Sequence, residues 1–407
     1  MPSPASEHGD RHPVLVWGLA AALATVGATI FAISPLLADI AASFGVAPAR
    51  AGSLVGVYGL SMAVVAPTVG LFARRLPRAR VIVAGLLVFA SAWFAAGAVH
   101  RFEALVVLTL AAGAATGAVV PAVYAYAGDL SSFAGRARMM GRVVSGWSVA
   151  IVLVVPLMAL ASQAIGWQRA FAGLAAAALA AALVLAAAAR PVRVPAEDDG
   201  DDDARLPVGT SLRRVLAHRP TRVVLAVNCI DMGAFYAVYA FLGSEMRRVN
   251  DWGAAPAGLV IAAYGAGLLI VTLNGRAIDR IGKTRSAIGA LCALGLVLAG
   301  LPWLVGSPAW LVAGILVWGC VQGAFFTAIT ALATEQIPGL RGVVTAMLSG
   351  STYLGVTLFS PLAVLLYEQA GFPAVGALAG LASVAAAALL AWPGAQVAMV
   401  DRRVNRP

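Results

Sequence analysis

Long apolar stretches, separated by short polar segments, run through the whole chain. Each stretch has about the 20 residues that an α-helix needs to cross a bilayer. The stretches lack the regular alternation of apolar and polar positions that marks a membrane β-barrel, so helices are expected to satisfy the backbone hydrogen bonds. The pattern predicts an all-α membrane protein with twelve transmembrane helices, at residues 14–38, 51–73, 81–99, 104–128, 139–163, 170–189, 221–243, 256–275, 286–304, 309–334, 343–367 and 372–393.

A polar segment in the middle of the chain divides these helices into two sets of six. Residues 190–220 contain the acidic run Glu197–Asp203 together with prolines and arginines. Such a composition is typical of a solvated linker. We expect an N-terminal six-helix bundle at 1–190, a cytoplasmic linker at 191–220, and a C-terminal six-helix bundle with a cytoplasmic tail at 221–407. A short interfacial helix is expected near 209–217.

The two halves repeat each other at an almost constant spacing of 205 or 206 residues. The matched pairs are Gly70 and Gly275, Gly117 and Gly323, Asp129 and Glu335, Pro156 and Pro361, and Gly166 and Gly371. Duplicated six-helix halves with a substrate site at mid-membrane, where the halves meet, are typical of secondary transporters. The repeat therefore predicts two pseudo-symmetric bundles around a shared site.

The composition requires lipid as the solvent. Hydrophobic residues make up 61% of the 407 residues and charged residues only 11%, whereas a soluble domain has about 25% charged residues. Of the 28 Lys and Arg residues, 23 lie in segments on one side of the predicted membrane. This bias predicts that both termini are cytoplasmic, and it explains the net charge of +10 without nucleic acid. We expect a multi-pass monomer in a bacterial inner membrane.

Two short polar loops lie at equivalent places in the two halves. The loop Gly275–Arg285 resembles the signature loop of the major facilitator superfamily, and its matching residues are Gly275, Asp279, Arg280, Gly282 and Lys283. The earlier copy, Gly70–Arg80, keeps Gly70, Arg75 and Arg78 but departs at Arg74 and Pro77. The resemblance implies the major facilitator fold and transport by alternating access.

The fifth predicted helix carries a second resemblance. Ser145–Pro156 resembles the fifth helix of bacterial arabinose-efflux-type and drug:proton antiporter members, whose glycine-rich signature ends at a proline. Gly146 and Pro156 match it, whereas Ala150 and Val154 stand where glycine is expected. The resemblance implies export in exchange for protons.

The repeat and the loops together predict a cytoplasmic gate. The fourth and tenth helices end at Asp129 and Glu335, on the side of the two loops. We expect the ion pairs Asp129–Arg75 and Glu335–Arg280, one in each half. Asp279 is expected near the start of the fifth helix, where the free N–H groups, Arg138 and Arg142 favour an anion.

Asp231 is the acidic residue that lies deepest inside an apolar stretch. It follows Arg222 by nine residues, which is roughly 14 Å along a helix. A charged group at this depth is costly, and this favours a function for it, here proton coupling. Asn228, Asp231, Phe235 and Tyr239 share one helical stripe, as in a cavity lining. The alternative is an Asp that only holds two helices together.

Other polar and aromatic residues are candidates for the same cavity, and each has helix packing as its alternative. They are Thr25, Thr29, Tyr58, Tyr124, Trp147, Ser148, Tyr264, Trp318, Gln322 and Tyr353. Because no Lys or Arg occupies the middle of a predicted helix, a neutral or cationic substrate is favoured. The pairs Gly113 and Gly117, and Gly319 and Gly323, are interpreted as close helix packing.

Catalytic chemistry is not expected. The sequence has no phosphate-binding loop and no nucleophile–base pair, and Cys229, Cys292 and Cys320 lie inside apolar stretches, so we expect no cofactor and no metal. The favoured function is proton-coupled efflux of a small neutral or cationic solute or drug. Two alternatives stay open: a proton-coupled importer of a neutral metabolite, and a non-transporting membrane receptor on the same scaffold.

Overall fold

The computed structural model describes residues 12–72, 77–130, 136–188, 207–273 and 280–395, and every element in these ranges is a helix. Eleven helical segments among the described residues are long and apolar enough to cross a membrane, and one of them, Met139–Ile165, contains a π-helical turn. The longest of them, α14 (Arg341–Ala391), consists of two spans that meet at Gly371, where the backbone is not helical. The twelve predicted spans are therefore confirmed. They are helical because a backbone in lipid must satisfy its hydrogen bonds within the span.

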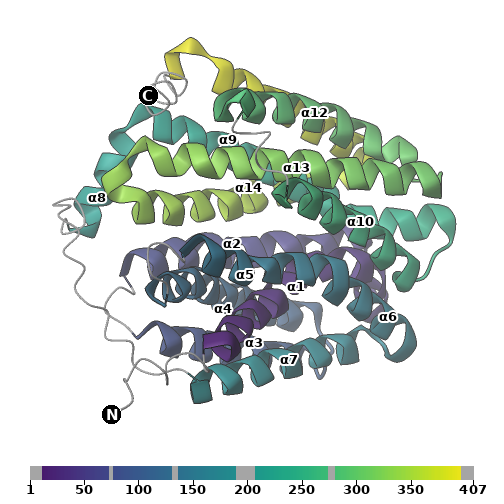
Figure 1. Cartoon of the computed structure of the whole chain (residues 1–407). Helices are drawn as coiled ribbons and strands as arrows, with labels where there is room; N and C mark the ends of the chain where they lie inside the picture. The colour runs from purple at the N-terminus through teal and green to yellow at the C-terminus, as the bar shows by residue number, and fades with distance from the viewer. Residues whose placement is uncertain (1–11, 73–76, 131–135, 189–206, 274–279, 396–407) are drawn as a thin grey trace.

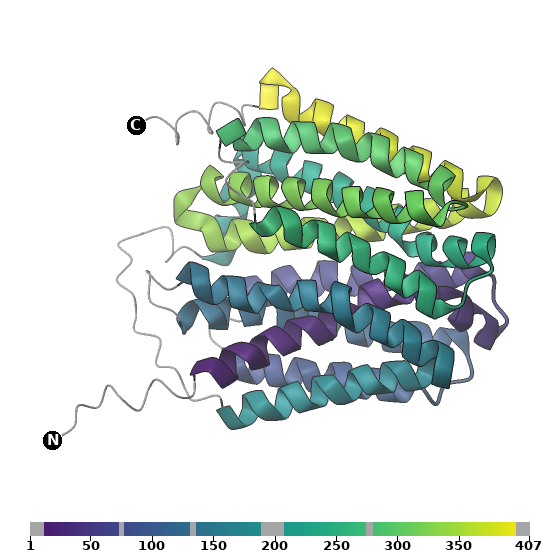
Figure 2. The same cartoon turned by 45° about the vertical axis from the view of Figure 1, so that its right-hand side comes forward.

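The spans form two layers, one from each half of the chain (Figures 1 and 2). The first layer contains α1 (His12–Phe44), α2 (Pro48–Phe72), α3 (Arg78–Ala96), α4 (Phe102–Asp129), α5 (Arg136–Val149), the π-helix η3 (Ala150–Val154), α6 (Val155–Ile165) and α7 (Trp167–Ala188). The second contains α9 (Arg219–Asn250), α10 (Ala254–Leu273), α12 (Lys283–Leu304), α13 (Pro308–Gln336) and α14. Short helices are α8 (Val208–Ala217), η5 (Pro338–Leu340) and η6 (Pro393–Ala395).

Two names describe the ends of the molecule. The linker end is where α7 ends and α8 begins, and α1 also begins there (Figure 1). The far end is where α1 ends at Phe44 and α9 ends at Asn250. Helix α8 lies at the linker end against α9, and it confirms the short helix that was expected near 209–217.

The same backbone geometry ends equivalent helices in the two halves. The residues after α1 and α9, Gly45 and Asp251, have φ values of 62° and 55°. Gly166 and Gly371, which separate the last two spans of each half, have φ values of 89° and 75°. Glycine, and less often Asp, tolerates this left-handed region. The repeat seen in the sequence thus extends to the helix ends.

Glycines allow close approach both within and between the halves. A Cβ at Gly113 would lie 2.6 Å from the Tyr58 carbonyl oxygen, and a Cβ at Gly319 would collide with the carbonyl of Tyr264. The glycine pairs of α4 and α13 therefore serve close helix packing, as predicted. Between the halves, a Cβ at Gly59 would lie 2.7 Å from Val356, and one at Gly265 would lie 2.7 Å from Val152.

The fifth span contains a π-helical turn, η3, directly before Pro156. The N–H of Val155 bonds to the carbonyl of Ala150, five residues earlier. Proline has no N–H and disturbs the preceding helical turn, and π-turns are one way in which a helix accommodates such a break. The irregular segment coincides with the one where the sequence departs from the antiporter pattern. Gly146, which keeps that pattern, lies against the backbone of α1 at Ala20.

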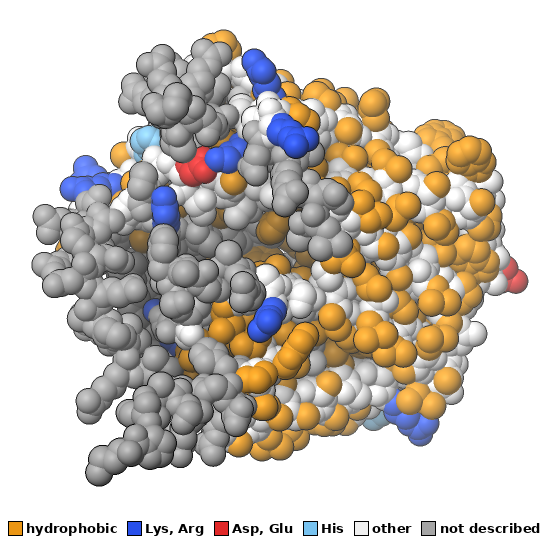
Figure 3. Space-filling model, in the orientation of Figure 1, with side chains coloured by type: hydrophobic (Ala, Val, Ile, Leu, Met, Phe, Trp, Pro, Cys, Tyr) orange, Lys and Arg blue, Asp and Glu red, His pale blue; other side chains and the backbone are white. Residues whose placement is uncertain are grey.

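The outer surface of the spans is apolar (Figure 3). Leu296 and Leu381 are 78% and 72% exposed, as expected for side chains that face acyl chains. Exposed tryptophans lie near both ends: Trp17 toward the linker end, and Trp303 and Trp310 toward the far end. Tryptophan favours the membrane–water interface, so these residues indicate where the two surfaces of the membrane lie.

Candidate functional site

The predicted stripe of α9 lies in the interior of the molecule. Helix α9 packs against α1 of the first half and against α13 and α14 of the second. Asn228, Asp231, Phe235 and Tyr239 are all buried, and Asp231 is 0% exposed. In this conformation the four side chains are enclosed by other helices and do not line an open cavity.

Asp231 and Gln322 form a pair between α9 and α13. The Nε2 of Gln322 donates a hydrogen bond of 2.7 Å to Oδ2 of Asp231. Among the residues that the structure describes, Oδ1 of Asp231 and Oε1 of Gln322 have no hydrogen-bond partner. A carboxyl group that is buried and bonded only to a neutral amide is exceptional, because buried polar groups are normally satisfied. The two sequence candidates therefore belong to one site.

Asn228 makes a different kind of contact. Its Nδ2 lies within hydrogen-bond distance of the Leu348 carbonyl, Ser351 Oγ and Thr352 Oγ1, all on α14. Since α9 and α14 both belong to the second half, the Asn228 amide serves packing within that half.

An aromatic cluster lies about one helical turn from the Asp231–Gln322 pair, on its far-end side, and includes Phe235 of α9 and Trp318 of α13. The centroid of Phe235 lies 4.9 Å from that of Trp318 and 5.6 Å from that of Tyr239. Tyr264 lies 5.3 Å from Trp318. Phe31 of α1 lies 5.2 Å from Tyr239, so the cluster joins the two halves. Tyr236 and Phe31, which sequence reasoning missed, also belong to it, and no repeat or motif indicated them.

The first-half candidates are bonded within their own half. The hydroxyl of Tyr58 lies 2.6 Å from Thr116 Oγ1 and donates to the Val26 carbonyl at 3.2 Å, which ties α2 to α4 and α1. Trp147 Nε1 donates to the hydroxyl of Tyr124 at 2.7 Å. Thr25 is buried and donates to the Ala22 carbonyl of its own helix at 2.9 Å. The remaining candidates are Thr29, which is fully buried, Ser148, which is half-buried, and Tyr353, which is 8% exposed on α14.

At the linker end, Glu335 has a different partner from the one predicted. Lys283 Nζ lies 2.5 Å from Glu335 Oε1, and Arg280 is exposed. The Glu335–Arg280 pair was therefore wrong. Gly282, with a φ of 93°, turns the backbone before α12, so Lys283 starts the helix beside the end of α13. In the first half Arg78, the repeat equivalent of Lys283, donates to the Ala125 carbonyl near the end of α4.

The other gate residues are only partly described. Arg142 is exposed on α5. The structure does not describe Arg75, Gly275 or Asp279, nor the side chains of Asp129 and Arg138, and the surroundings of Gly70 are likewise outside the described residues. The Asp129–Arg75 pair and the position of Asp279 stay predictions.

At the far end, the two halves are joined through a proline in α1. Pro35 has no N–H, so the carbonyl of Phe31 lacks its partner within the helix, and the hydroxyl of Tyr239 donates to it at 2.9 Å. Ser34 Oγ donates to the Tyr239 carbonyl and accepts from the N–H of Gly243 at 3.0 Å. The Ser34 hydroxyl thus bridges two backbone groups of α9, and a Cβ at Gly243 would collide with the Ser34 backbone.

An ion pair extends this junction outward. Arg247 Nη2 lies 2.6 Å from Asp39 Oδ1, and Nη1 lies 2.9 Å from Oδ2. Arg247 also donates to the Pro35 carbonyl at 3.0 Å. We call Ser34, Pro35, Asp39, Tyr239, Gly243 and Arg247 the far-end latch. Sequence reasoning missed most of it, because its partners lie 205 to 212 residues apart on α1 and α9 and no motif marks them.

The arrangement offers a buried carboxyl that can take up a proton, and side chains of both halves are bonded to each other at the far end. In the part of the chain that the structure describes, no group of three or more His, Cys, Asp or Glu side chains could hold a metal ion. The polar groups of the site are a carboxyl, amides, hydroxyls and the indole N–H groups of Trp147 and Trp318. They are suited to recognition and proton binding.

Comparison with known proteins places the chain in a family. The model of the Major Facilitator Superfamily matches residues 19–345 and 224–398. An uncharacterized MFS-type transporter, YwfA, of Bacillus subtilis (strain 168) is 28% identical over 371 residues, which cover 91% of this chain and 90% of that protein. A chloramphenicol resistance protein of Streptomyces lividans is 28% identical over 319 residues, with 77% and 78% of the two chains covered.

A solved structure shares the fold. The nucleoside transporter NupG, determined as a point mutant, superposes with a TM-score of 0.77 at 13% sequence identity, covering 92% of this chain and 98% of that chain. Twelve spans in two pseudo-symmetric layers define a membrane transporter fold. The chain belongs to the major facilitator superfamily.

Proposed function

We propose that the chain is a secondary active transporter that works by alternating access and exports a small neutral or cationic solute or drug in exchange for protons. The observation that carries this proposal is the buried Asp231–Gln322 pair beside an aromatic cluster to which both halves contribute. Protonation neutralises the Asp231 carboxylate. This removes the main free-energy cost of enclosing that side chain in a low-dielectric site. Proton binding is thereby coupled to closure of the site.

The surroundings of the pair support the substrate class. Aromatic faces attract cations, and a carboxylate adds to that attraction. A carrier of anions would instead need a basic residue near mid-membrane, and the sequence places none there. With the linker end cytoplasmic, as the distribution of basic residues favours, the far-end latch closes the outer side. In this conformation the outer side is then closed and the site is enclosed, and we expect the transporter to work as a monomer.

Flux in proteoliposomes tests the proposal. Purified protein is reconstituted, a pH gradient is imposed, and uptake of fluorescent organic cations and of neutral solutes is followed. Wild-type flux is expected to depend on the gradient. Asp231→Asn is expected to abolish gradient-driven accumulation while substrate exchange without a gradient continues. Asp251→Asn, at an exposed acid whose left-handed backbone Asn also tolerates, serves as the matched control.

Three results would contradict parts of the proposal. Gradient-driven flux that persists in Asp231→Asn removes the proton role of this residue. Absence of flux for every solute favours a receptor on the same scaffold. A deletion strain that fails to grow on a nutrient, and is not more sensitive to toxic compounds, favours an importer.

A further inference from the structure

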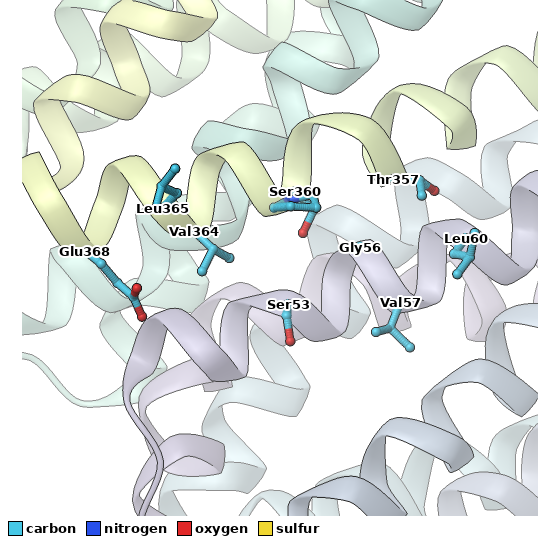
Figure 4. Close-up of a pocket in the computed structure, with 10 residues that line it drawn as sticks. Ser53, Gly56, Val57, Leu60, Thr357, Ser360, Val364, Leu365 and Glu368 are labelled. Carbon is cyan, nitrogen blue, oxygen red and sulfur yellow. The ribbon is translucent and has the colours of Figure 1, made fainter.

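A groove of about 470 Å³ runs along the contact between α2 of the first half and α14 of the second (Figure 4). Its α2 wall is formed by Ser53, Gly56, Val57 and Leu60. Its α14 wall is formed by Thr357, Ser360, Pro361, Val364, Leu365 and Glu368. The groove is separate from the Asp231 site and does not depend on the function proposed above.

The groove opens toward the hydrocarbon of the membrane. Leu60 and Leu365, one on each wall, are 45% and 47% exposed, and the neighbouring Leu358 and Leu362 are 59% and 41% exposed. Leucines that are exposed on membrane spans meet lipid acyl chains. The two helices touch at Gly56, where an added Cβ would lie 2.5 Å from Ser360 Cβ. A second close contact, between Gly59 and Val356, lies one turn along α2, and the groove runs beside these contacts.

The length of the groove corresponds to one leaflet. From Thr357 to Glu368 the α14 wall has eleven steps, or roughly 16 Å at about 1.5 Å per residue. Half of the hydrocarbon core of a bilayer is about 15 Å thick. Thr357 lies near the middle of its span, and Glu368 lies near the end of that span at the far end. The groove therefore covers the leaflet at the far end.

Glu368 places a negative charge at the membrane-surface end of this groove. Its side chain is exposed, and in Figure 4 it reaches across the end of the groove toward α2. Among the described residues no ion pair involves it. A lipid with a cationic group that can donate hydrogen bonds would complement this carboxylate.

We propose that the groove binds an acyl chain of a phospholipid from the far-end leaflet, with the ammonium of an ethanolamine headgroup at Glu368. A choline headgroup carries the same charge but has no N–H to donate, and an acidic headgroup is repelled. Because the two walls belong to different halves, a bound chain also stabilises the arrangement of the halves in this conformation.

Native mass spectrometry of the full chain tests the headgroup. The protein is released from bilayers that contain equal amounts of ethanolamine and choline phospholipids, and the retained lipids are counted. Wild type is expected to retain the ethanolamine lipid preferentially. Glu368→Gln is expected to lower that preference by roughly two- to fivefold, the range of an exposed ion pair. Glu103→Gln, at an exposed far-end acid paired with Arg50, is expected to leave it unchanged.

Filling the groove tests the acyl chain. Val57→Trp is expected to remove the retained lipid, whereas Leu296→Trp, at a lipid-facing position on α12 that is 78% exposed, is expected to keep it. Equal retention by Val57→Trp and wild type, or equal retention of choline and ethanolamine lipids by wild type, would overturn the proposal.

Discussion

Asp231 is buried in the membrane interior with one hydrogen bond, which it accepts from Gln322. A buried acceptor that loses its donor costs more than the bond itself contributed, because nothing replaces the water it gave up on folding. The pair therefore matters to stability as well as to proton binding. The two roles can be separated, because removal of both polar groups together restores stability but not proton binding.

Gln322→Leu is expected to destabilise the protein by about 1–3 kcal/mol, the cost of an unsatisfied buried polar group. The double variant Asp231→Leu, Gln322→Leu is expected to recover most of that loss, since leucines fill a similar volume without polar atoms. Thermal unfolding in detergent measures both, with Gln168→Leu on α7 as a control. A double variant no more stable than Gln322→Leu would show that the pair has other essential partners.

At the scale of elements, the junction of α1 and α9 depends on two departures from regular helix bonding. Pro35 frees the carbonyl of Phe31, and Ser34 bridges the Tyr239 carbonyl and the Gly243 N–H. Arg247 then holds Asp39 in a bidentate pair. Its neighbour Arg248 pairs with Glu245 on the same helix and so does not join the halves. These adjacent arginines form a natural matched pair.

Arg247→Ala is expected to shift the protein toward a conformation open at the far end by about 1–3 kcal/mol, because Asp39 and the Pro35 carbonyl lose a charged donor. Spin labels are attached at Ala42 and Val249, which are exposed positions on the last turns of α1 and α9. Pulsed electron–electron double resonance then measures the distance between the two labels. Arg248→Ala should leave the distance distribution unchanged. Identical distributions for wild type and Arg247→Ala would mean that the latch does not hold this end closed.

At the scale of the whole molecule, two equivalent glycines lie where the halves meet. Gly59 of α2 faces Val356 of α14, and Gly265 of α10 faces Val152 of η3. Each glycine follows a tyrosine, Tyr58 or Tyr264, that packs within its own half. The two interfaces between the halves therefore carry the same small residue at the same place in the repeat. Any movement of one half relative to the other has to change the packing at both interfaces.

Gly59→Val and Gly265→Val are expected to destabilise this conformation by about 1–3 kcal/mol each, because an added side chain overpacks the interface. Both should lower transport and the unfolding temperature in detergent. Gly173→Ala, at a position on α7 with nothing within 4 Å of an added Cβ, is the control. If only one of the two variants has an effect, the interfaces are not equivalent in the transport cycle.

Much of the architecture was predictable because the bilayer imposes it on the sequence. Twelve apolar stretches of the right length, the 205-residue repeat and the central polar linker followed from residue patterns alone. The packing glycines Gly113 and Gly319 were also predictable, since a small residue every fourth position has one common use in a membrane helix. The site was predicted in part: Asp231 and Gln322 were both named, but not as a pair.

The sequence by itself determined which segments enter the lipid and that the halves are copies. A span must be apolar along almost its whole length, and the copies keep matching residues at a constant spacing. Only the tertiary structure decided which side chains meet. It gave Glu335 the partner Lys283 instead of Arg280, since the backbone turn at Gly282 sets the start of α12. It also formed the far-end latch from residues about 200 positions apart, because contacts between helices depend on their relative rotation and not on local pattern.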